Sequence, residues 1–452
     1  MEIGTAAPEL DRGMEGTAVR RAHRRLGCDL VPGRPDAVVV GAGIVGLAAA
    51  FHLAHEGLKV CLLDASQVGD AQSTRNWGFI RQQGRAVEEL PIMIEANRMW
   101  PQLAAQLGCD LDWVQGGNLR LTDSPERAED YQRWIDTART FGLDSRIVLP
   151  DEVGRLVPGF AGRYLMAILT PSDGQANPVK VVAGYARALR SMGVTIREYS
   201  RAHAIVTAGN RTVGVLTDDG FIGTSNVVLA AGVGSAALLR SVGLEIPVQL
   251  VTQTVALTSP VPKVTSACVW TGEIGFRQAP SGEVVLSSGG RGDVRVDLAS
   301  LASLLSPRGA RQALPMYWKN RDYLRIRPRQ VLGALRSRRQ GDRLEETPLY
   351  SDVANSVEAM ARYFPDLRLD VATAWAGTID GTPDALPVID AVDQAAGLVV
   401  ATGMSGHGFG IAPAIGRIVA DLVIRGSSGH DLSPFRLRRF REGKARAPQH
   451  LL

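Results

Sequence analysis

The most regular pattern of hydrophobic and polar positions lies near the start of the chain, over residues 37–64. An unbroken apolar run at 38–40 predicts a short buried strand, and the alanine-rich segment before Gly57 predicts a helix. The segment KVCLL at 59–63 predicts another buried strand. Strand, helix and strand in this order are typical of two parallel strands joined by a crossover helix.

Two later segments carry related patterns. Residues 172–240 contain an amphipathic helix, then short strands that we expect to rejoin the first sheet, and a buried strand that ends in the Ala-Ala-Gly triplet at 230–232. Residues 373–440 contain the stretch GMSGHGFGIAP and a helix predicted over 411–424, with Pro413 in its first turn. The short strands of the first segment are predicted at 204–207, 212–217 and 221–223.

The remaining segments predict a second domain, because apolar runs such as 248–258 and 282–288 are typical of a mixed sheet. We therefore predict an α/β fold, with a Rossmann-like nucleotide-binding domain on a parallel sheet and a second α+β domain with a mixed or antiparallel sheet. The predicted division is a polar N-terminal extension at 1–36, a discontinuous nucleotide-binding domain at 37–90, 171–245 and 371–440, a substrate-binding domain at 91–170 and 246–370, and a C-terminal tail at 441–452.

The first pattern also carries a ligand signature. Gly41, Gly43 and Gly46 form a GxGxxG motif between the first strand and the helix, and Asp64 ends the second strand. In this arrangement the first glycine allows a tight turn, the second lets a pyrophosphate approach the backbone, and the third lets the helix pack on the sheet. The acid can accept hydrogen bonds from an adenosine ribose. The spacing predicts a dinucleotide site.

Composition narrows the class of protein. The chain has 452 residues, 45% of them hydrophobic, and no apolar run long enough for a bilayer, so we expect no transmembrane segment. The first 27 residues lack the apolar core of a secretory signal. Four cysteines without metal-ligand spacing predict free thiols, no metal and a cytoplasmic location.

Charge is less informative. The net charge is only +4, and nothing in it predicts a nucleic-acid partner. The densest basic cluster, 321–343, is interrupted by Asp322 and Asp342. This favours the solvated face of a helix over a grip on an anionic surface.

The chain resembles the D-amino acid oxidase superfamily of FAD-dependent oxidoreductases, which includes glycine oxidase and monomeric sarcosine oxidase. The resemblance is carried by VVVGAGIVGLAAAFHLA, STRNWG, DGQANP, VVLAAGVGS, GTPDALPVI and SGHGFGIAPAIG. It implies that the nucleotide is FAD, that the last glycine-rich loop lies against the isoalloxazine ring, and that the N-terminus of the following helix points at the ring's pyrimidine edge. The residues it implies for cofactor binding are Gly41, Gly43, Ile44, Val45, Gly46, Asp64, Ala65, Ser73, Thr74, Arg75, Asn76, Gly78, Ala202, Ala231, Gly232, Gly403, Ser405, Gly406, His407, Gly408 and Phe409.

Departures from the family pattern refine the prediction. Gly377 occupies the position of a flavin-linking cysteine, and no histidine occurs between 64 and 90, so FAD should be bound non-covalently. Ile379, Gly406 and Gly410 stand where relatives have substrate-carboxylate anchors. The resemblance leaves Arg81 as a candidate for that role, against the alternative of a solvent-facing arginine. His407 is the second candidate catalytic residue, unless its ring packs away from the site.

The resemblance implies an enzyme that oxidises the C–N bond of an amino acid or amine by hydride transfer to flavin N5, giving an imine that hydrolyses. The electron acceptor is O₂ or another compound. Two alternatives stay open: a membrane-peripheral dehydrogenase that uses a quinone, with 321–343 as its membrane contact, and a non-catalytic FAD-binding subunit. A flavin hydroxylase shares the first motif, but we find no convincing second flavin loop or NADPH-linked motif.

Overall fold

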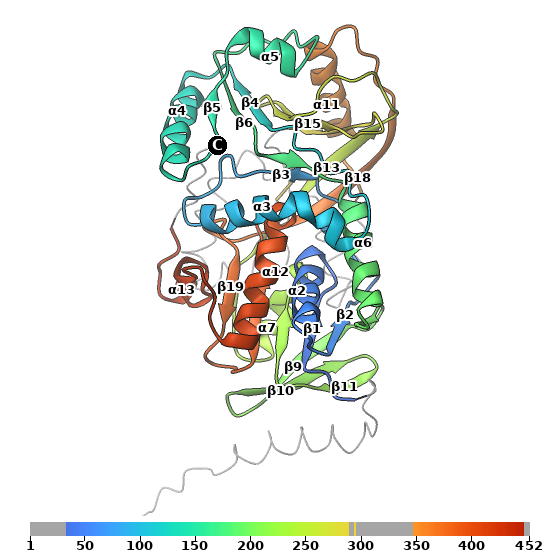
Figure 1. Ribbon diagram of the computed structural model, residues 1–452, viewed down its shortest axis with the longest axis vertical. Helices are drawn as coiled ribbons and strands as arrows, with labels where there is room; N and C mark the ends of the chain where they lie inside the picture. The colour runs from blue at the N-terminus through green and yellow to red at the C-terminus, as the bar shows by residue number, and fades with distance from the viewer. Residues whose placement is uncertain (1–32, 289–292, 295–346, 447–452) are drawn as a thin grey trace, which may run out of the picture.

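The computed structural model describes residues 33–288, 293–294 and 347–446. Most of the predicted N-terminal extension and the basic cluster at 321–343 therefore lie outside the described residues. The described part is elongated, with α3 (Leu90–Leu107) crossing between its two ends (Figure 1). None of its helices has both the length and the apolar character needed to cross a bilayer.

The first sheet confirms the predicted Rossmann-like half of the α/β fold. It has six strands in the order β19-β20-β12-β1-β2-β8, and every neighbouring pair except β19–β20 is parallel. The inner strands β1, β2 and β12 are covered on both faces, so all their residues are apolar and buried. The strands are β1 (Ala37–Val40), β2 (Val60–Leu63), β8 (Thr195–Arg197), β12 (Val227–Leu229), β19 (Val388–Ala391) and β20 (Leu398–Thr402).

Two helices lie side by side over this sheet, α2 (Ile44–His55) and α12 (Gly408–Arg425) (Figure 1). A Cβ on Gly416 would lie 2.5 Å from the backbone carbon of Ala48, so only a glycine lets the two helices approach this closely. On the other side of α2 packs α6 (Pro178–Ser191), whose N-cap Asn177 accepts hydrogen bonds from two backbone N–H groups of the first turn.

The second sheet confirms the predicted mixed sheet. Its order is β17-β13-β16-β15-β14-β4-β6-β5, with β18 also paired to β13. All pairs are antiparallel except β14 with β4. The strands are β4 (Asn118–Thr122), β5 (Arg146–Ile147), β6 (Met166–Thr170), β13 (Gln249–Thr258), β14 (Cys268–Trp270), β15 (Ile274–Gln278), β16 (Val284–Ser288), β17 (Asp293–Val294) and β18 (Val371–Gly381). The helices near this end are α4 (Pro125–Thr140), α5 (Pro150–Leu156) and α11 (Tyr350–Tyr363).

Three of the short strands pair differently from the prediction. We expected them to rejoin the first sheet, but β9 (Ala202–Ala208), β10 (Arg211–Thr217) and β11 (Gly220–Gly223) do not. Short turns fold them into an antiparallel sheet of their own. Of the strands described within residues 172–240, β8 and β12 belong to the parallel sheet. The domain division stays a prediction, and β18, which it assigned to the nucleotide-binding domain, pairs along its length with β13.

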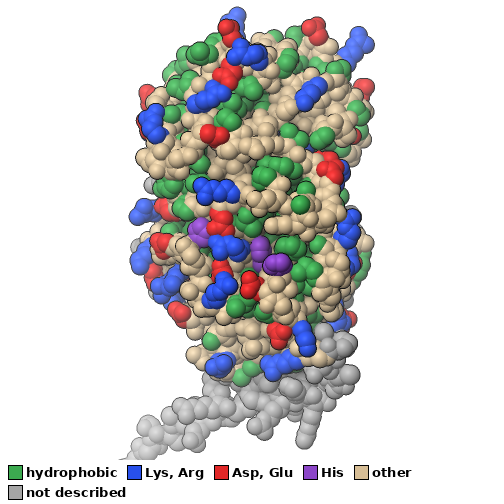
Figure 2. Space-filling model, in the orientation of Figure 1, with side chains coloured by type: hydrophobic (Ala, Val, Ile, Leu, Met, Phe, Trp, Pro, Cys, Tyr) green, Lys and Arg blue, Asp and Glu red, His purple; other side chains and the backbone are tan. Residues whose placement is uncertain are grey.

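Charged side chains of both signs are mixed on the surface. Figure 2 shows basic and acidic side chains interspersed over one face of the molecule. Among the described residues, Cys61, Cys109 and Cys268 are free thiols.

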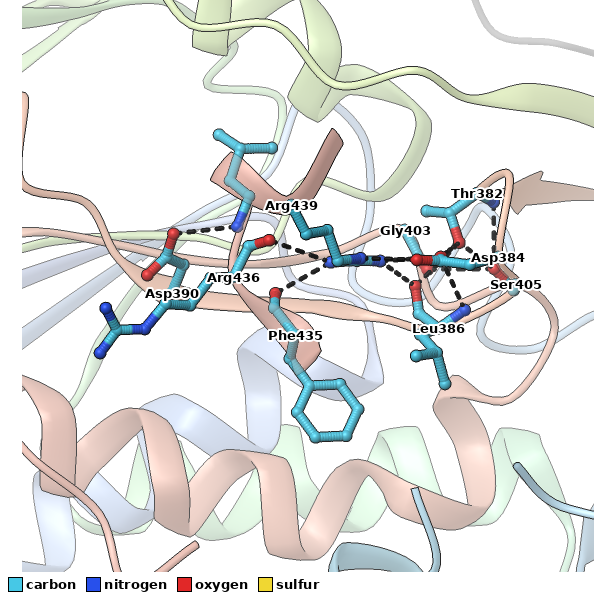
Figure 3. A network of polar contacts seen from close by, with 10 residues as sticks. Thr382, Asp384, Leu386, Asp390, Gly403, Ser405, Phe435, Arg436 and Arg439 are labelled. Carbon is cyan, nitrogen blue, oxygen red and sulfur yellow. Dashed lines mark hydrogen bonds and ion pairs between the residues drawn. The ribbon is translucent and has the colours of Figure 1, made fainter. Parts of the chain in front are cut away.

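A buried ion pair connects the C-terminal segment to the turn after β18 (Figure 3). Arg439, on α13 (Arg438–Arg441), donates to both carboxylate oxygens of Asp384 at 2.7 and 3.0 Å and to the backbone O of Leu386 at 2.8 Å. Both side chains of the pair are 4% exposed. The Asp384 carboxylate also accepts from Thr382 Oγ1, so the pair fixes the turn that precedes β19.

The first prediction concerns this pair. Arg439→Met would leave Asp384 buried without its cation, and breaking a buried pair in this way costs on the order of 3–5 kcal/mol. We expect a clear fall in the apparent melting temperature measured by differential scanning fluorimetry. The matched control is Arg438→Met, because Arg438 is exposed and its ion pairs are long, 3.7 and 3.8 Å. Equal melting temperatures for the two variants would contradict the prediction.

Candidate functional site

The turn between β1 and α2 is held by close backbone packing. Gly41 has φ +106°, and a Cβ there would lie 2.3 Å from the backbone O of Ala230 at the end of β12. A Cβ on Gly46 would lie 1.8 Å from the backbone O of Gly41. These glycines let β1, α2 and β12 meet at one edge of the sheet. Ala231, also a predicted cofactor contact, lies against the same turn.

Gly43 differs from its neighbours, because protein atoms do not enclose it. The nearest atom to an added Cβ is Ser73 Oγ, at 3.0 Å. The same hydroxyl accepts a hydrogen bond from Ile44 N at 2.8 Å, at the N-terminus of α2. Ile44 thus lies beside Ser73 at the N-terminus of α2, with Gly43 and Val45 on either side of it in the chain. A helix N-terminus of this kind is the type of site that binds a pyrophosphate.

Asp64 lies at the end of β2, next to the same turn. Its carboxylate accepts from Ala42 N at 2.7 Å and from Ser66 N at 2.9 Å, and burial raises its pKa. The backbone O of Asp64 accepts from Ser200 N at 2.8 Å. This contact brings the start of β9, with Ala202, towards Asp64, while Ala65 is exposed.

The segment after Ser73 uses most of its polar groups to fix its own shape. Thr74 Oγ1 donates to the backbone O of Gly69 at 2.8 Å. Asn76 donates to the backbone O of Ser73 and accepts from Gly78 N at 2.7 Å. The backbone O of Arg75 accepts from Trp375 Nε1 of β18 at 2.9 Å, so this loop lies between the two sheets.

Asp380, which the sequence did not single out, connects three predicted cofactor-binding loops. It accepts from Gln72 Nε2 at 3.0 Å and from Gly403 N at 3.1 Å. Gln72 in turn lies against Gly232, where an added Cβ would be 2.3 Å from Gln72 Oε1. Burial raises the pKa of Asp380.

The glycine-rich loop leads directly into α12. Gly403, Ser405 and Gly406 all have positive φ, at +64°, +50° and +80°. The helix begins at Gly408, three residues earlier than predicted, so Pro413 lies inside it and not in its first turn. The loss of one helical hydrogen bond at Pro413 is tolerated within this buried helix. Phe409 is buried, with its ring centroid 5.2 Å from that of Trp100.

His407 precedes α12 as its N-cap residue and contacts the segment before α3. Its Nδ1 lies 3.0 Å from Oε2 of the fully buried Glu89. Burial lowers the pKa of His407 to about 4. Burial alone would raise the pKa of Glu89, but His407 and Arg85 outweigh it and lower that pKa. The directions of these two shifts favour a neutral imidazole beside an ionised carboxylate, with Nδ1–H as the donor.

Arg81 lies close to two further arginines that the sequence did not single out, Arg85 and Arg120. Burial and the charges of these two neighbours lower the pKa of Arg81. Arg85 Nε donates to the backbone O of Arg81 at 3.2 Å. Arg120 is on β4, where its guanidinium carbon lies 5.2 Å from the ring centroid of Trp270.

An aromatic pair connects Arg120 of this group of three arginines to the loop at 73–78. The rings of Trp77 and Trp270 are stacked, with centroids 5.2 Å apart. A Cβ on Gly275 of β15 would meet both Trp77 and Trp270 at 2.5 and 2.6 Å. Arg277, on the same strand, donates to the backbone O of Trp77 and to Gln175 Oε1. The second sheet therefore presents aromatic and cationic groups towards the dinucleotide loops.

The fit to a dinucleotide rests on the open backbone at Gly43, the hydroxyl of Ser73 and the acid at Asp64. The structure brings these residues together with the loops at 230–232 and 403–408. Their assignment as FAD contacts, and that of Arg81 and His407 as catalytic residues, stays a prediction. Within the described ranges, no group of three or more His, Cys, Asp or Glu side chains could hold a metal ion.

Residues 36–422 match the sequence family described as FAD dependent oxidoreductase. The chain is 27% identical to the sarcosine oxidase subunit beta of Rhodobacter capsulatus, over 91% of this chain and 90% of that protein. It is 25% identical to the glycine oxidase of Geobacillus kaustophilus, over 90% and 97%. Among solved structures, L-amino acid deaminase from Proteus myxofaciens is similar in fold, with a TM-score of 0.80 and 24% identity over 91% of this chain and 94% of that one.

The second prediction concerns Gly43. A valine there would place carbon atoms beside Ser73, in the space that we assign to a pyrophosphate. Acid precipitation of the wild-type protein should release its yellow colour into the supernatant, and Gly43→Val should release almost none. Gly154→Val is the control, because an added Cβ on that exposed glycine meets nothing within 4 Å. Colour that stays with the wild-type pellet would overturn non-covalent attachment.

Proposed function

The chain belongs to the FAD dependent oxidoreductase family, and on this premise we propose that it oxidises the carbon–nitrogen bond of an amine or amino acid that carries an acidic group. Its relatives include proteins named for the oxidation of sarcosine and glycine. The observation that carries the acidic group is the placement of Arg81 among cations beside the loop at 73–78.

When bound, FAD supplies the oxidant, because its ring accepts a hydride from the carbon next to the amine. We expect the turn after β1, Ser73 and the N-terminus of α2 to hold the pyrophosphate, and Asp64 to hold the adenosine ribose. The attachment is non-covalent in this proposal. Gly377, at the position of a linking cysteine, has no reactive side chain, and an added Cβ there would lie 3.2 Å from Arg75 Cβ.

Arg81 provides the hydrogen-bond donors for the acidic group. Among the described residues, its guanidinium has one acceptor, the backbone O of Gln83. Its other N–H groups stay available, and the side chain keeps some exposure while Arg85 and Arg120 are buried. A carboxylate can accept two parallel N–H bonds from a guanidinium, which would fix its orientation as well as its position.

The remaining chemistry asks little of the protein's own acids and bases. The substrate reacts as the neutral amine, so loss of a hydride from its carbon leaves a protonated imine. Water converts this imine to a carbonyl compound and a protonated amine. The chain's part is to orient the substrate and to exclude water from it. His407 holds its proton towards Glu89, so it acts here through the position of the α12 N-terminus. The electron acceptor is O₂ or another oxidant.

The third prediction tests the reaction itself. Under anaerobic conditions, at least one acid-bearing amine or amino acid should bleach the visible absorbance of the bound flavin. Simple amines of the same size should do so more slowly, because they lack a partner for Arg81. If dithionite bleaches the flavin and no member of an amine and amino acid panel does, the protein is a non-catalytic FAD-binding subunit.

The fourth prediction concerns Arg81. Truncating one side of a desolvated charge pair costs on the order of 2–5 kcal/mol, so Arg81→Ala should raise the half-saturating substrate concentration roughly 30-fold or more. Arg81→Lys should recover little, because an ammonium cannot form the paired hydrogen bonds. The FAD content should not change. Arg98→Ala, an exposed arginine on α3, serves as the control, and wild-type half-saturation in Arg81→Ala would remove the assigned role.

A further inference from the structure

The region around Arg81 contains an unbalanced buried charge. Three guanidinium groups, Arg81, Arg85 and Arg120, face two carboxylates, Glu89 and Asp173. Both carboxylates have no exposed surface, whereas Arg85 is 3% and Arg120 is 5% exposed. Within this group the guanidiniums outnumber the carboxylates by one, and the exposed Arg127 adds a further positive charge near Arg120. An unpaired charge is costly to bury, so such a cluster is suited to an anionic partner.

The hydrogen bonds of the cluster are also incomplete. Within the described residues, Arg85 Nη1 and Arg120 Nε are buried donors without an acceptor. Oε1 of Glu89 is likewise a buried acceptor without a donor. Buried polar atoms without partners are rare in folded proteins, and a bound water, ion or ligand is one way to satisfy them. The donors belong to the two arginines that the proposed function does not use.

Each carboxylate of the cluster is already engaged by the protein. Asp173 accepts from the backbone N–H groups of Gln82 and Gln83 at 2.7 and 3.2 Å. Glu89 Oε2 is bound to His407. Among the described residues, neither Glu89 nor Asp173 forms an ion pair within 4 Å with Arg85 or Arg120. Arg120 is instead placed over the ring of Trp270 and interacts with the Tyr131 side chain by a hydrogen bond, while its Nε has no acceptor among the described residues.

We propose that Arg85 and Arg120 form a second anion subsite, so that the substrate is an amino dicarboxylate, with one acidic group on Arg81 and the other on this pair. The inference rests on the proposed function for its first acidic group and for the amine. In solution an amino acid with one carboxylate is a zwitterion of net charge zero, whereas an amino dicarboxylate carries a net charge of −1. The second acidic group therefore brings the acceptors and the negative charge that Arg85 and Arg120 lack.

The subsite lies close enough to serve the same molecule. Arg85 is tied by its Nε to the backbone of Arg81. Arg120 and Trp270 are partners in the register of β4 and β14, and Trp270 stacks on Trp77 of the loop at 73–78. A second acidic group bound here would therefore lie on the side of Arg81 that faces the second sheet.

The test uses acids that cannot be oxidised, so that binding is measured apart from turnover. The holoenzyme is titrated with malonate, succinate and glutarate, and in parallel with propionate, butyrate and valerate. Binding is followed by changes in the flavin absorbance and by calorimetry. At least one dicarboxylate should bind ten or more times more tightly than the monocarboxylate with the same number of carbon atoms. Equal affinities, or no binding of either class, would overturn the second subsite.

Variants locate the effect. Arg120→Gln and Arg85→Gln should each remove most of the preference for dicarboxylates and leave the affinity for propionate within about twofold. Arg127→Gln, a nearby exposed arginine on α4, should keep the preference. Arg120→Lys keeps the positive charge, so it serves as a second variant if Arg120→Gln fails to fold. A loss of affinity for both classes of acid alike in Arg120→Gln would assign Arg120 to the structure of the site and refute the subsite.

The two proposals can fail separately. If dicarboxylates bind preferentially but no amine bleaches the flavin, the proposed oxidation is wrong and the subsite stands. If an amino acid with one carboxylate bleaches the flavin at lower concentrations than aspartate, glutamate and iminodiacetate, the oxidation stands and the second subsite is wrong.

Discussion

The close packing of α2 against α12 is the constraint on which the rest of the site depends. Gly416 removes the side chain that would keep the helices apart, and its contact with Ala48 sets their distance. Because β1 and β20 run parallel in one sheet, the helices that follow them begin at the same edge. Two helix N-termini are thus placed together, and each offers free N–H groups and a partial positive charge to an anionic cofactor.

Charge is distributed unevenly around that edge. On the side of the first sheet, the positive potential comes from backbone N–H groups and is balanced locally, for example by Asp64 and Asp380. On the side of the second sheet it comes from guanidinium groups that outnumber their carboxylates. The first kind of site suits a cofactor that stays bound. The second suits a small anion that enters and leaves.

The sequence predicted the parts of the site that depend on short stretches of chain. Gly41, Gly43 and Asp64 lie within one strand–helix–strand unit, so their spacing alone specifies the turn. Arg85, Glu89 and Arg120 could not be found in this way, because their burial depends on the packing of the segment at 81–89 against β4. α12 begins earlier than the sequence predicted, because glycines and Pro413 weaken helix propensity in this segment. Packing against α2 outweighs that local preference.

The strand order of the first sheet also governs how the chain can fold as it is synthesised. β20 lies between β12 and β19, so one edge of β12 keeps its backbone groups unpaired until residues 398–402 have left the ribosome. By then β1, β2 and β12 have long been available, and an open apolar strand edge invites association with other chains. Long-range pairing of this kind folds slowly. The edge of β12 is therefore exposed to wrong pairing until β20 is in place.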